Sequence, residues 1–234
     1  MNGTASPHLV DLSASPTRAL NQALHALGPD TNETLWRVVR PDGRHAIAVG
    51  IDAPITVEID GHVGYYCAGM NKRARVIVNG NAGPGVAENM MSGTVHVRGD
   101  ASQAAGATGR GGLLLIDGNA SARCGISMKG IDIVVKGGVG HMSAFMAQAG
   151  TLIVLGDAGE SLGDSVYEAR LYVRGAVASL GADCVAKTMS DHHRAKLRAR
   201  LDAAGISGVD VGEFRRYGSA RRLYHFHVDN ALAY

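Results

Sequence analysis

Residues 77–85 read IVNGNAGPG, a β-branched run followed by three glycines within six residues. The glycine at position 80 recurs at a fixed interval of nineteen residues in both directions along the chain. The column formed in this way is Gly61, Gly80, Gly99, Gly118, Gly137, Gly156 and Gly175. An interval this regular identifies an internal repeat, which has to be found before single elements are assigned.

Three apolar or small-residue columns accompany the glycines. Four residues before each glycine stand Val57, Val76, Val95, Leu114, Ile133, Leu152 and Leu171. Two residues before stand Ile59, Val78, Val97, Ile116, Val135, Val154 and Val173, and two after stand Val63, Ala82, Ala101, Ala120, Val139, Ala158 and Val177. A spacing of two is the period of a β-strand with one apolar face. A unit of nineteen residues cannot bury that face alone, so the repeat predicts a β-solenoid of stacked coils.

The solenoid explains the glycines of the opening stretch. Seven coils spaced ~4.8 Å apart give a rod of roughly 30 Å, and the glycine column marks a corner that needs positive φ or a close approach of two backbones. The next column, His62, Asn81, Asp100, Asn119, Gly138, Asp157 and Ala176, is rich in residues that bond their own backbone in turns. Two glycine motifs are known to bind phosphate, G-x-G-x-x-G and G-x-x-x-x-G-K-[ST], and the sequence contains neither. The left-handed β-helix is excluded too, because it needs coils of eighteen and an aliphatic residue at every sixth position.

The segments on either side of the repeat predict a three-part organisation. Residues 1–54 contain a helix over 15–28, capped by Ser15, and strands in TLWRVVRP and HAIAVGI that shield the first coil. Residues 55–187 form the solenoid. Residues 188–234 begin with a helix over 188–205, capped near Ser190 and stopped at Gly205, and end in an arginine-rich and aromatic tail.

The tail allows two interpretations. Its arginines are Arg215, Arg216, Arg221 and Arg222, and they alternate with Phe214, Tyr217, Tyr224 and Phe226. This composition is typical of a binding interface. Solenoids also need end caps, so the same segment is equally suited to fold back over the last coil.

Residues able to carry chemistry are scattered along the repeat. Cys67 and Cys124 share a column but stand three coils apart, which is roughly 14 Å, and Cys184 lies in another column. Asp100 and Asp157 are also three coils apart, so they cannot act as a general acid–base pair. We expect the cysteines to be small buried side chains and the methionines Met90, Met91, Met128, Met142 and Met146 to fill gaps or meet a partner. His225 and His227 could be two metal ligands, but no third ligand is near in the sequence.

Composition excludes several other functions. The net charge is +2 and aromatic residues make up only 5% of 234 residues, so we expect neither a nucleic-acid nor a membrane partner. No apolar run could serve as a signal or a membrane span. Three cysteines without a disulfide spacing favour a cytoplasmic setting. No site residue is therefore predicted: none catalytic, none cofactor-binding and none metal-ligating.

Two long stretches carry a resemblance to a known family. The run GNAGPGVAENMMSGTVHVRGDASQAAGATGRGGLLLIDGNASARCGISMKG and its continuation through GADC resemble the GXGXG domain at the C-terminus of the glutamate synthase large subunit. The start AVGIDAPITVEIDGHVGYYCAGMNK and the ending EFRRYGSARRLYHFHVDNALAY are similar to the stand-alone form of that domain, the middle subunit of N-methylglutamate synthases. The resemblance covers about residues 35–234.

The resemblance implies a right-handed parallel β-helix that acts as a non-catalytic scaffold in a complex. One implied partner is an amidotransferase-like subunit, and the other is a synthase subunit that carries FMN and an iron–sulfur cluster. The implied reaction converts methylamine and glutamate into N-methylglutamate and ammonia. No cofactor is expected on this chain. The chain starts Met1-Asn2 and so offers no N-terminal cysteine of the amidotransferase kind.

Other functions remain open at this stage. A more distant resemblance is to the β-helix subunit of formylmethanofuran dehydrogenase, which implies a place in a formyltransferase-type complex. Another glutamine-dependent, glutamate-synthase-like enzyme is a further alternative. A different class of hypothesis is a stand-alone enzyme that uses His225, His227 and the arginines of the tail.

Overall fold

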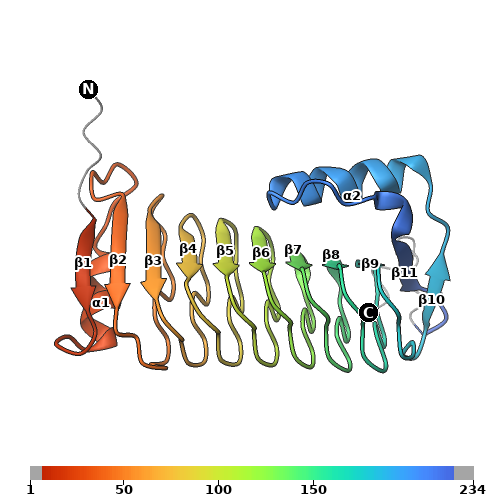
Figure 1. The fold of residues 1–234 in the computed structure, drawn as a ribbon, viewed down its shortest axis with the longest axis horizontal. Helices are drawn as coiled ribbons and strands as arrows, with labels where there is room; N and C mark the ends of the chain where they lie inside the picture. Colours follow the sequence, from red (N-terminus) through yellow and green to blue (C-terminus); the bar gives the residue numbers. More distant parts are fainter. Residues whose placement is uncertain (1–6, 224–234) are drawn as a thin grey trace, which may run out of the picture.

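The computed structural model describes residues 7–223 and contains one sheet of eleven strands. The strands occur in the order β1-β2-β3-β4-β5-β6-β7-β8-β9-β11-β10, and Figure 1 shows the coils stacked along the long axis of the molecule. The strands and helices are β1 His8–Asp11, α1 Thr17–His25, β2 Leu35–Val39, β3 Thr56–Asp60, β4 Arg75–Val78, β5 Thr94–Val97, β6 Leu113–Ile116, β7 Lys129–Val135, β8 Ala149–Val154, β9 Arg170–Val173, β10 Cys184–Lys187, α2 Asp191–Ala203, the 3-10 helix η1 Val211–Glu213 and β11 Arg215–Ser219. The predicted parallel β-solenoid of about seven turns is confirmed.

The strand register follows the nineteen-residue repeat. From β3 to β9 the paired residues are nineteen positions apart, as in Val57 with Val76 and Val76 with Val95. The exception is the start of β7, where Lys129 pairs with Ala149 and the register shifts before Asp132. Every side chain of the two aliphatic columns before the glycine is 0% exposed. The column after the glycine forms a second ladder of parallel bridges from Val63 to Val177. The two ladders enclose the core, and the hydrophobic effect of stacking coils holds it together.

The glycine column is explained by close contact between coils. Of its seven members only Gly61 has a positive φ, 138°. A Cβ on Gly80 would lie 2.7 Å from the carbonyl carbon and oxygen of Gly61, and one on Gly156 would lie 2.7 Å from the carbonyl carbon of Gly137. Real Cβ atoms do not approach a backbone so closely. Glycine is therefore required at this corner because any side chain would clash with the backbone of the neighbouring coil.

The polar column after the glycine bonds between coils. The side chain of Asn81 accepts a hydrogen bond from the backbone N–H of Asp100 at 2.9 Å, and Asp100 accepts one from Asn119 at 2.7 Å. Asn119 in turn accepts from Gly138 at 2.9 Å. The expectation that these side chains bond their own backbone is therefore wrong, because the stacking places the N–H group of the following coil within reach.

Left-handed backbone occurs on the wall opposite the strands. We call residues 64–72 and the equivalent residues of later coils the turn arm. Alternate residues of this arm have positive φ, such as Ala68 at 54° and Ala87 at 57°. Their backbone groups bond to adjacent coils, for example the Ala87 N–H to the Cys67 carbonyl at 2.9 Å. The arm is thus held by inter-coil hydrogen bonds as the strands are.

The predicted strand HAIAVGI is wrong. These residues, 45–51, form turns with positive φ at Ala46, Ala48 and Gly50, equivalent to a turn arm. The arm alternates side chains inward and outward with a period of two, as a strand does. Alternation alone could not distinguish the two conformations.

Helix α1 covers the first coils. It begins after Pro16, which is the N-cap residue in place of the expected Ser15. Leu20 and Leu24 are buried in the main core, and the Asn21 side-chain amide donates to the Ala46 carbonyl at 2.8 Å. These contacts shield the apolar end of the solenoid from water.

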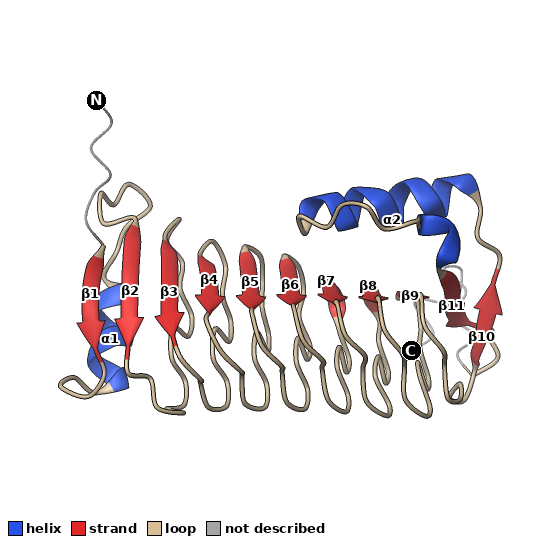
Figure 2. Cartoon of the chain, in the orientation of Figure 1, coloured by secondary structure: helices blue, strands red, loops and turns tan. Residues whose placement is uncertain are grey.

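Helix α2 lies along the outer face of the sheet, which is the face turned away from the solenoid core (Figure 2). Its residues Leu197 and Leu201 form a second apolar cluster. The sheet contributes Leu115, Val134, Ile153 and Tyr172 to this cluster. Ser190 caps the helix in a capping box with His193, and Gly205 follows its end with φ 71°, as the sequence predicts.

The tail as far as Leu223 takes part in the cap. Strand β11 inserts antiparallel between β9 and β10, and it buries Tyr217 while Phe214 packs beneath α2. The capping interpretation is therefore correct for this part of the tail. Tyr224, His225, Phe226 and His227 lie outside the described residues, so the predicted metal pair is not tested.

Candidate functional site

The three cysteines lie inside the solenoid or its cap. Cys67 and Cys124 are 0% exposed, and burial raises the pKa of each thiol to about 12. Cys184 is 6% exposed, and burial is the main cause that raises the pKa of its thiol to about 11. All three are free. Since the thiolate is the nucleophile and the metal ligand, these side chains behave as small hydrophobic groups.

The candidate acids and bases have structural partners. Asp100 and Asp157 each accept a backbone N–H from the next coil, and His62 accepts the N–H of Asn81 at 2.9 Å. Within residues 7–223 no group of three or more His, Cys, Asp or Glu side chains could hold a metal ion. Over the same residues no helix is both long and apolar enough to cross a membrane.

A row of charges crosses the outer sheet face that α2 leaves uncovered. Asp60 accepts hydrogen bonds from Asn79 at 2.8 Å and Arg37 at 2.6 Å, and these bonds lower the pKa of its carboxyl group. Further along, Asp117 is bonded to His96 at 2.9 Å and to Lys136 at 2.7 Å.

Burial opposes the ionisation of Asp117, but the bonds from Lys136 and His96 outweigh it and hold its pKa below the ordinary value. The sequence reasoning missed this row. His96 and Asp117 are separated by 21 residues, one coil plus two. That spacing makes them diagonal neighbours on one face, and it was the signal that could have found them.

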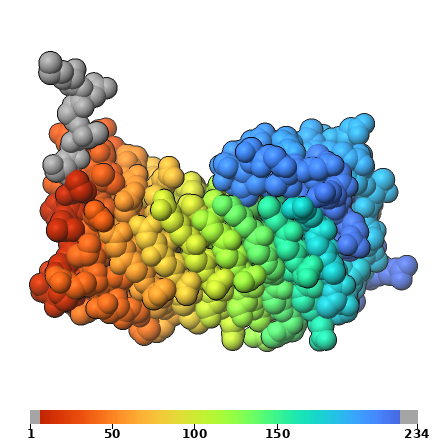
Figure 3. Space-filling view, viewed as in Figure 1, coloured from red at the N-terminus to blue at the C-terminus, as the bar shows by residue number. Residues whose placement is uncertain are grey.

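The end of α2 and this uncovered face enclose a hollow, which we call the saddle. The cavity measures about 290 Å³ and its lining includes Arg75, Thr94, His96, Leu115 and Gly205. In the space-filling view it lies between the N-terminal part and α2, over the yellow and green coils (Figure 3). The saddle is a concave surface whose lining combines the basic side chains of Arg75 and His96 with the apolar side chain of Leu115.

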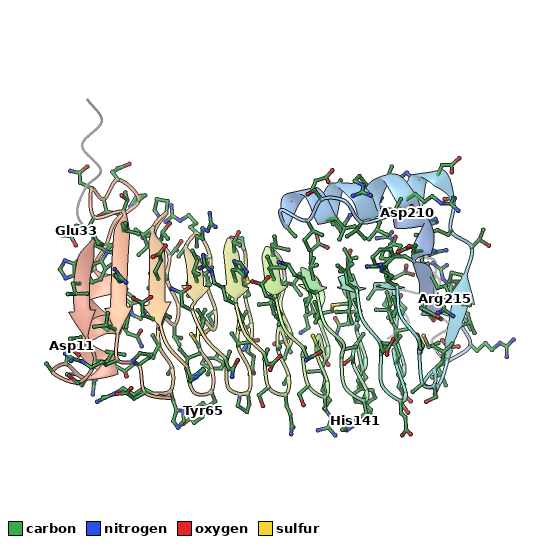
Figure 4. All side chains as sticks on the ribbon, viewed as in Figure 1. Asp11, Glu33, Tyr65, His141, Asp210 and Arg215 are labelled. Carbon is green, nitrogen blue, oxygen red and sulfur yellow. The ribbon has the colours of Figure 1, made fainter. Side chains whose placement is uncertain are left out.

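The turn arm exposes several large apolar side chains. Tyr65 is 53% exposed and Met146 is 44% exposed, and Met70 and Met91 are also exposed. Met90 and Met128 are buried completely, which fits the predicted role of filling gaps, and Met142 is half-buried. The predicted contact of the exposed methionines with a partner stays a prediction. Figure 4 shows Tyr65 and His141, which share one column, projecting from the same edge. Exposed aromatic and methionine side chains are enriched in protein interfaces.

Comparison with known proteins finds a close relative. The chain is 61% identical over 226 residues to "Protein GlxC" of Rhizobium meliloti (strain 1021), and this match spans 97% of the chain and 99% of the relative. No protein-family model matches the chain. No solved structure matches it.

Proposed function

The chain belongs to the family of Protein GlxC of Rhizobium meliloti, and we propose that it is a non-catalytic scaffold subunit of a glutamate-synthase-like enzyme complex. The family resemblance of residues 35–234 supports the class of complex. The solenoid supports the scaffold role, because every coil is fixed to its neighbours by backbone hydrogen bonds on both walls. A rod of this kind holds two partners at a fixed separation and orientation.

The complex that we propose is an N-methylglutamate synthase. In it, an amidotransferase-like subunit and an FMN- and iron–sulfur-containing subunit would bind to different parts of this chain. Substrate, flavin and cluster would all be held by the partners. A formyltransferase-type complex and another glutamine-dependent, glutamate-synthase-like enzyme are the alternatives.

The observation that carries the proposal is the set of apolar side chains exposed on the turn arm. Met70 and Met146 occupy one column, four coils apart, which is ~19 Å along the rod. Tyr65 and Met91 extend the same arm. Flexible thioethers beside a rigid aromatic ring suit a partner surface that has to be matched by shape.

Affinity purification of the tagged chain from its native cell tests the proposal. We expect two larger proteins to copurify, one amidotransferase-like and one with the absorbance of flavin and an iron–sulfur cluster. Formyltransferase and molybdenum or tungsten proteins in their place would favour the formyl alternative. Stoichiometric flavin on the separated chain, or purification without partners, would contradict the scaffold role.

Substitutions on the turn arm locate the interface. Met146→Asp places a charge at an exposed position whose left-handed backbone, φ 52°, suits Asp. We expect the chain to fold normally and to lose at least one partner. Met146→Leu is the matched control, because it keeps the side chain apolar and should keep both partners.

A further inference from the structure

The last three strands of the sheet bring three basic residues to one face. Lys187 of β10 pairs directly with Arg216 of β11, and Arg216 pairs with Tyr172 of β9. Paired residues point to the same face, and Arg170 stands two positions from Tyr172 in β9, so all three cations lie on the outer face. This arrangement follows from the register of strands that are distant in the sequence.

The positive charge of this cluster is not balanced by the described part of the chain. Like charges placed directly opposite each other on paired strands repel, which destabilises the sheet. The Arg216 guanidinium donates from Nε to the Thr188 carbonyl at 3.0 Å. Within residues 7–223 the side chains of Arg170 and Lys187 have neither a hydrogen bond nor an ion pair.

Among the described residues that line the cavity next to this cluster, one carries a carboxylate, Glu168. Glu168 is paired with Arg221 at 2.9 Å, and both side chains are at least half exposed. The pair neutralises itself. The three cations of the sheet therefore keep a net charge of about three.

These cations line a cavity of about 300 Å³. Gly218 of β11 forms part of its wall, and a Cβ added there would lie 3.7 Å from the Ala169 carbonyl oxygen and 3.8 Å from Cγ of Lys187. Both are ordinary contact distances. The absence of a side chain at position 218 thus leaves open a space that a larger residue would fill.

His193, in the first turn of α2, also lines the cavity. Burial lowers the pKa of its imidazole, and Arg216, His192, Arg170 and Lys196 lower it further by repulsion. The surroundings of His193 thus disfavour the protonated, positively charged form of its imidazole. The positive end of the α2 dipole acts in the same sense.

We propose that this cavity binds a small oxyanion, of the phosphate or carboxylate class, between Arg170, Lys187 and Arg216. Guanidinium groups bind such oxyanions with paired, charge-assisted hydrogen bonds, and the ammonium group of Lys187 adds a point charge. Binding would bridge β9, β11 and β10 and so fasten the C-terminal cap. The site is separate from the turn arm and does not depend on the scaffold role.

Calorimetric titration of the full-length chain with inorganic phosphate, and in parallel with succinate, tests the site at constant ionic strength. We expect one anion per chain. Arg170→Gln and Lys187→Gln should each weaken binding by about tenfold or more, since charge-assisted bonds are the strong ones. Arg98→Gln is the matched control, because it removes an exposed arginine that follows β5 and does not line this cavity.

Two further readouts separate a built site from general attraction to positive charge. Gly218→Val keeps every charge, suits a strand and projects a branched side chain into the cavity beside Lys187, so it should weaken binding by about tenfold or more while circular dichroism stays unchanged. Phosphate should raise the pKa of His193, measured by NMR, because a nearby anion favours the imidazolium. Absence of binding to the full-length chain, or equal weakening by Arg98→Gln, would overturn the proposal.

Discussion

The carboxylate of Asp100 accepts the backbone N–H of Asn119 at 2.7 Å, one coil further along the solenoid. Asn81 stands in the same relation to Asp100, and Asn119 to Gly138. The ladder ends at Gly138, which has no side chain, and a further bond joins Asp157 to Ala176 at 2.7 Å. A polar side chain at the corner therefore accepts the backbone N–H of the equivalent residue in the next coil, which would otherwise have no acceptor within residues 7–223.

Removal of one member of this ladder should lower stability. Asp100→Ala removes the acceptor for the Asn119 N–H, and we expect the free energy of unfolding to fall by about 1 kcal/mol. Asp100→Asn keeps an acceptor oxygen, as the natural residues at 81 and 119 do, and should retain most of the stability. Urea titration measures both. Equal losses for the two variants would mean that charge, not the inter-coil bond, is what matters.

The glycine corner gives a sharper test of close packing. Gly156→Ala would place a Cβ 2.7 Å from the carbonyl carbon of Gly137, so adjacent coils must move apart, at a cost of roughly 1–3 kcal/mol. Gly28→Ala is the control, since a Cβ there meets nothing within 4 Å. Thermal unfolding should separate the two variants clearly. A melting temperature for Gly156→Ala at or above that of Gly28→Ala would contradict the spacing between coils.

The charge row on the outer sheet face predicts a loss of stability in acid. The pKa of Asp117 is lower in the folded chain than its ordinary value of 3.8, so its ionised form stabilises the fold above that pH. This contribution disappears as the pH falls through the lowered pKa. Asp117→Asn should therefore destabilise the protein at pH 6 and should flatten the decline below about pH 4. Asp30→Asn, which removes an exposed carboxylate elsewhere in the chain, is the matched control.

The buried thiols should resist modification. We expect the folded chain to react slowly with a disulfide reagent at pH 7.5, because Cys67 and Cys124 are inaccessible and their raised pKa of about 12 keeps them protonated. All three cysteines should react within minutes after unfolding in urea. Rapid labelling of two thiols in the native chain would show that the coils open.

The repeat made most of the fold predictable. The inward columns, the interval of nineteen and the stacking follow from counting, because each coil repeats the same packing problem. The alternation in HAIAVGI does not reveal a turn arm, because a left-handed turn arm and a strand share a period of two. Position 115 and its equivalents at 134, 153 and 172 are apolar on the outer face, and this signal could have placed α2 over them.

The candidate sites were less accessible to sequence reasoning. The pairing of Lys187 with Arg216 depends on the insertion of β11 between β9 and β10, which no repeat encodes. The saddle likewise depends on where α2 ends. The columns do separate buried Met90 from exposed Met91, because the equivalents of Met91 are Lys72, Arg110, Lys129 and Gln148, whereas the equivalents of Met90 are uncharged.

The scaffold role is tested most directly by a cryo-EM map of the complex purified through a tag on this chain. We expect the solenoid to lie between an amidotransferase-like subunit and an FMN-containing subunit and to contact both, with flavin and iron–sulfur density confined to the partner. A map in which flavin or a cluster is bound by this chain, or in which the solenoid joins no second subunit, would contradict the proposal.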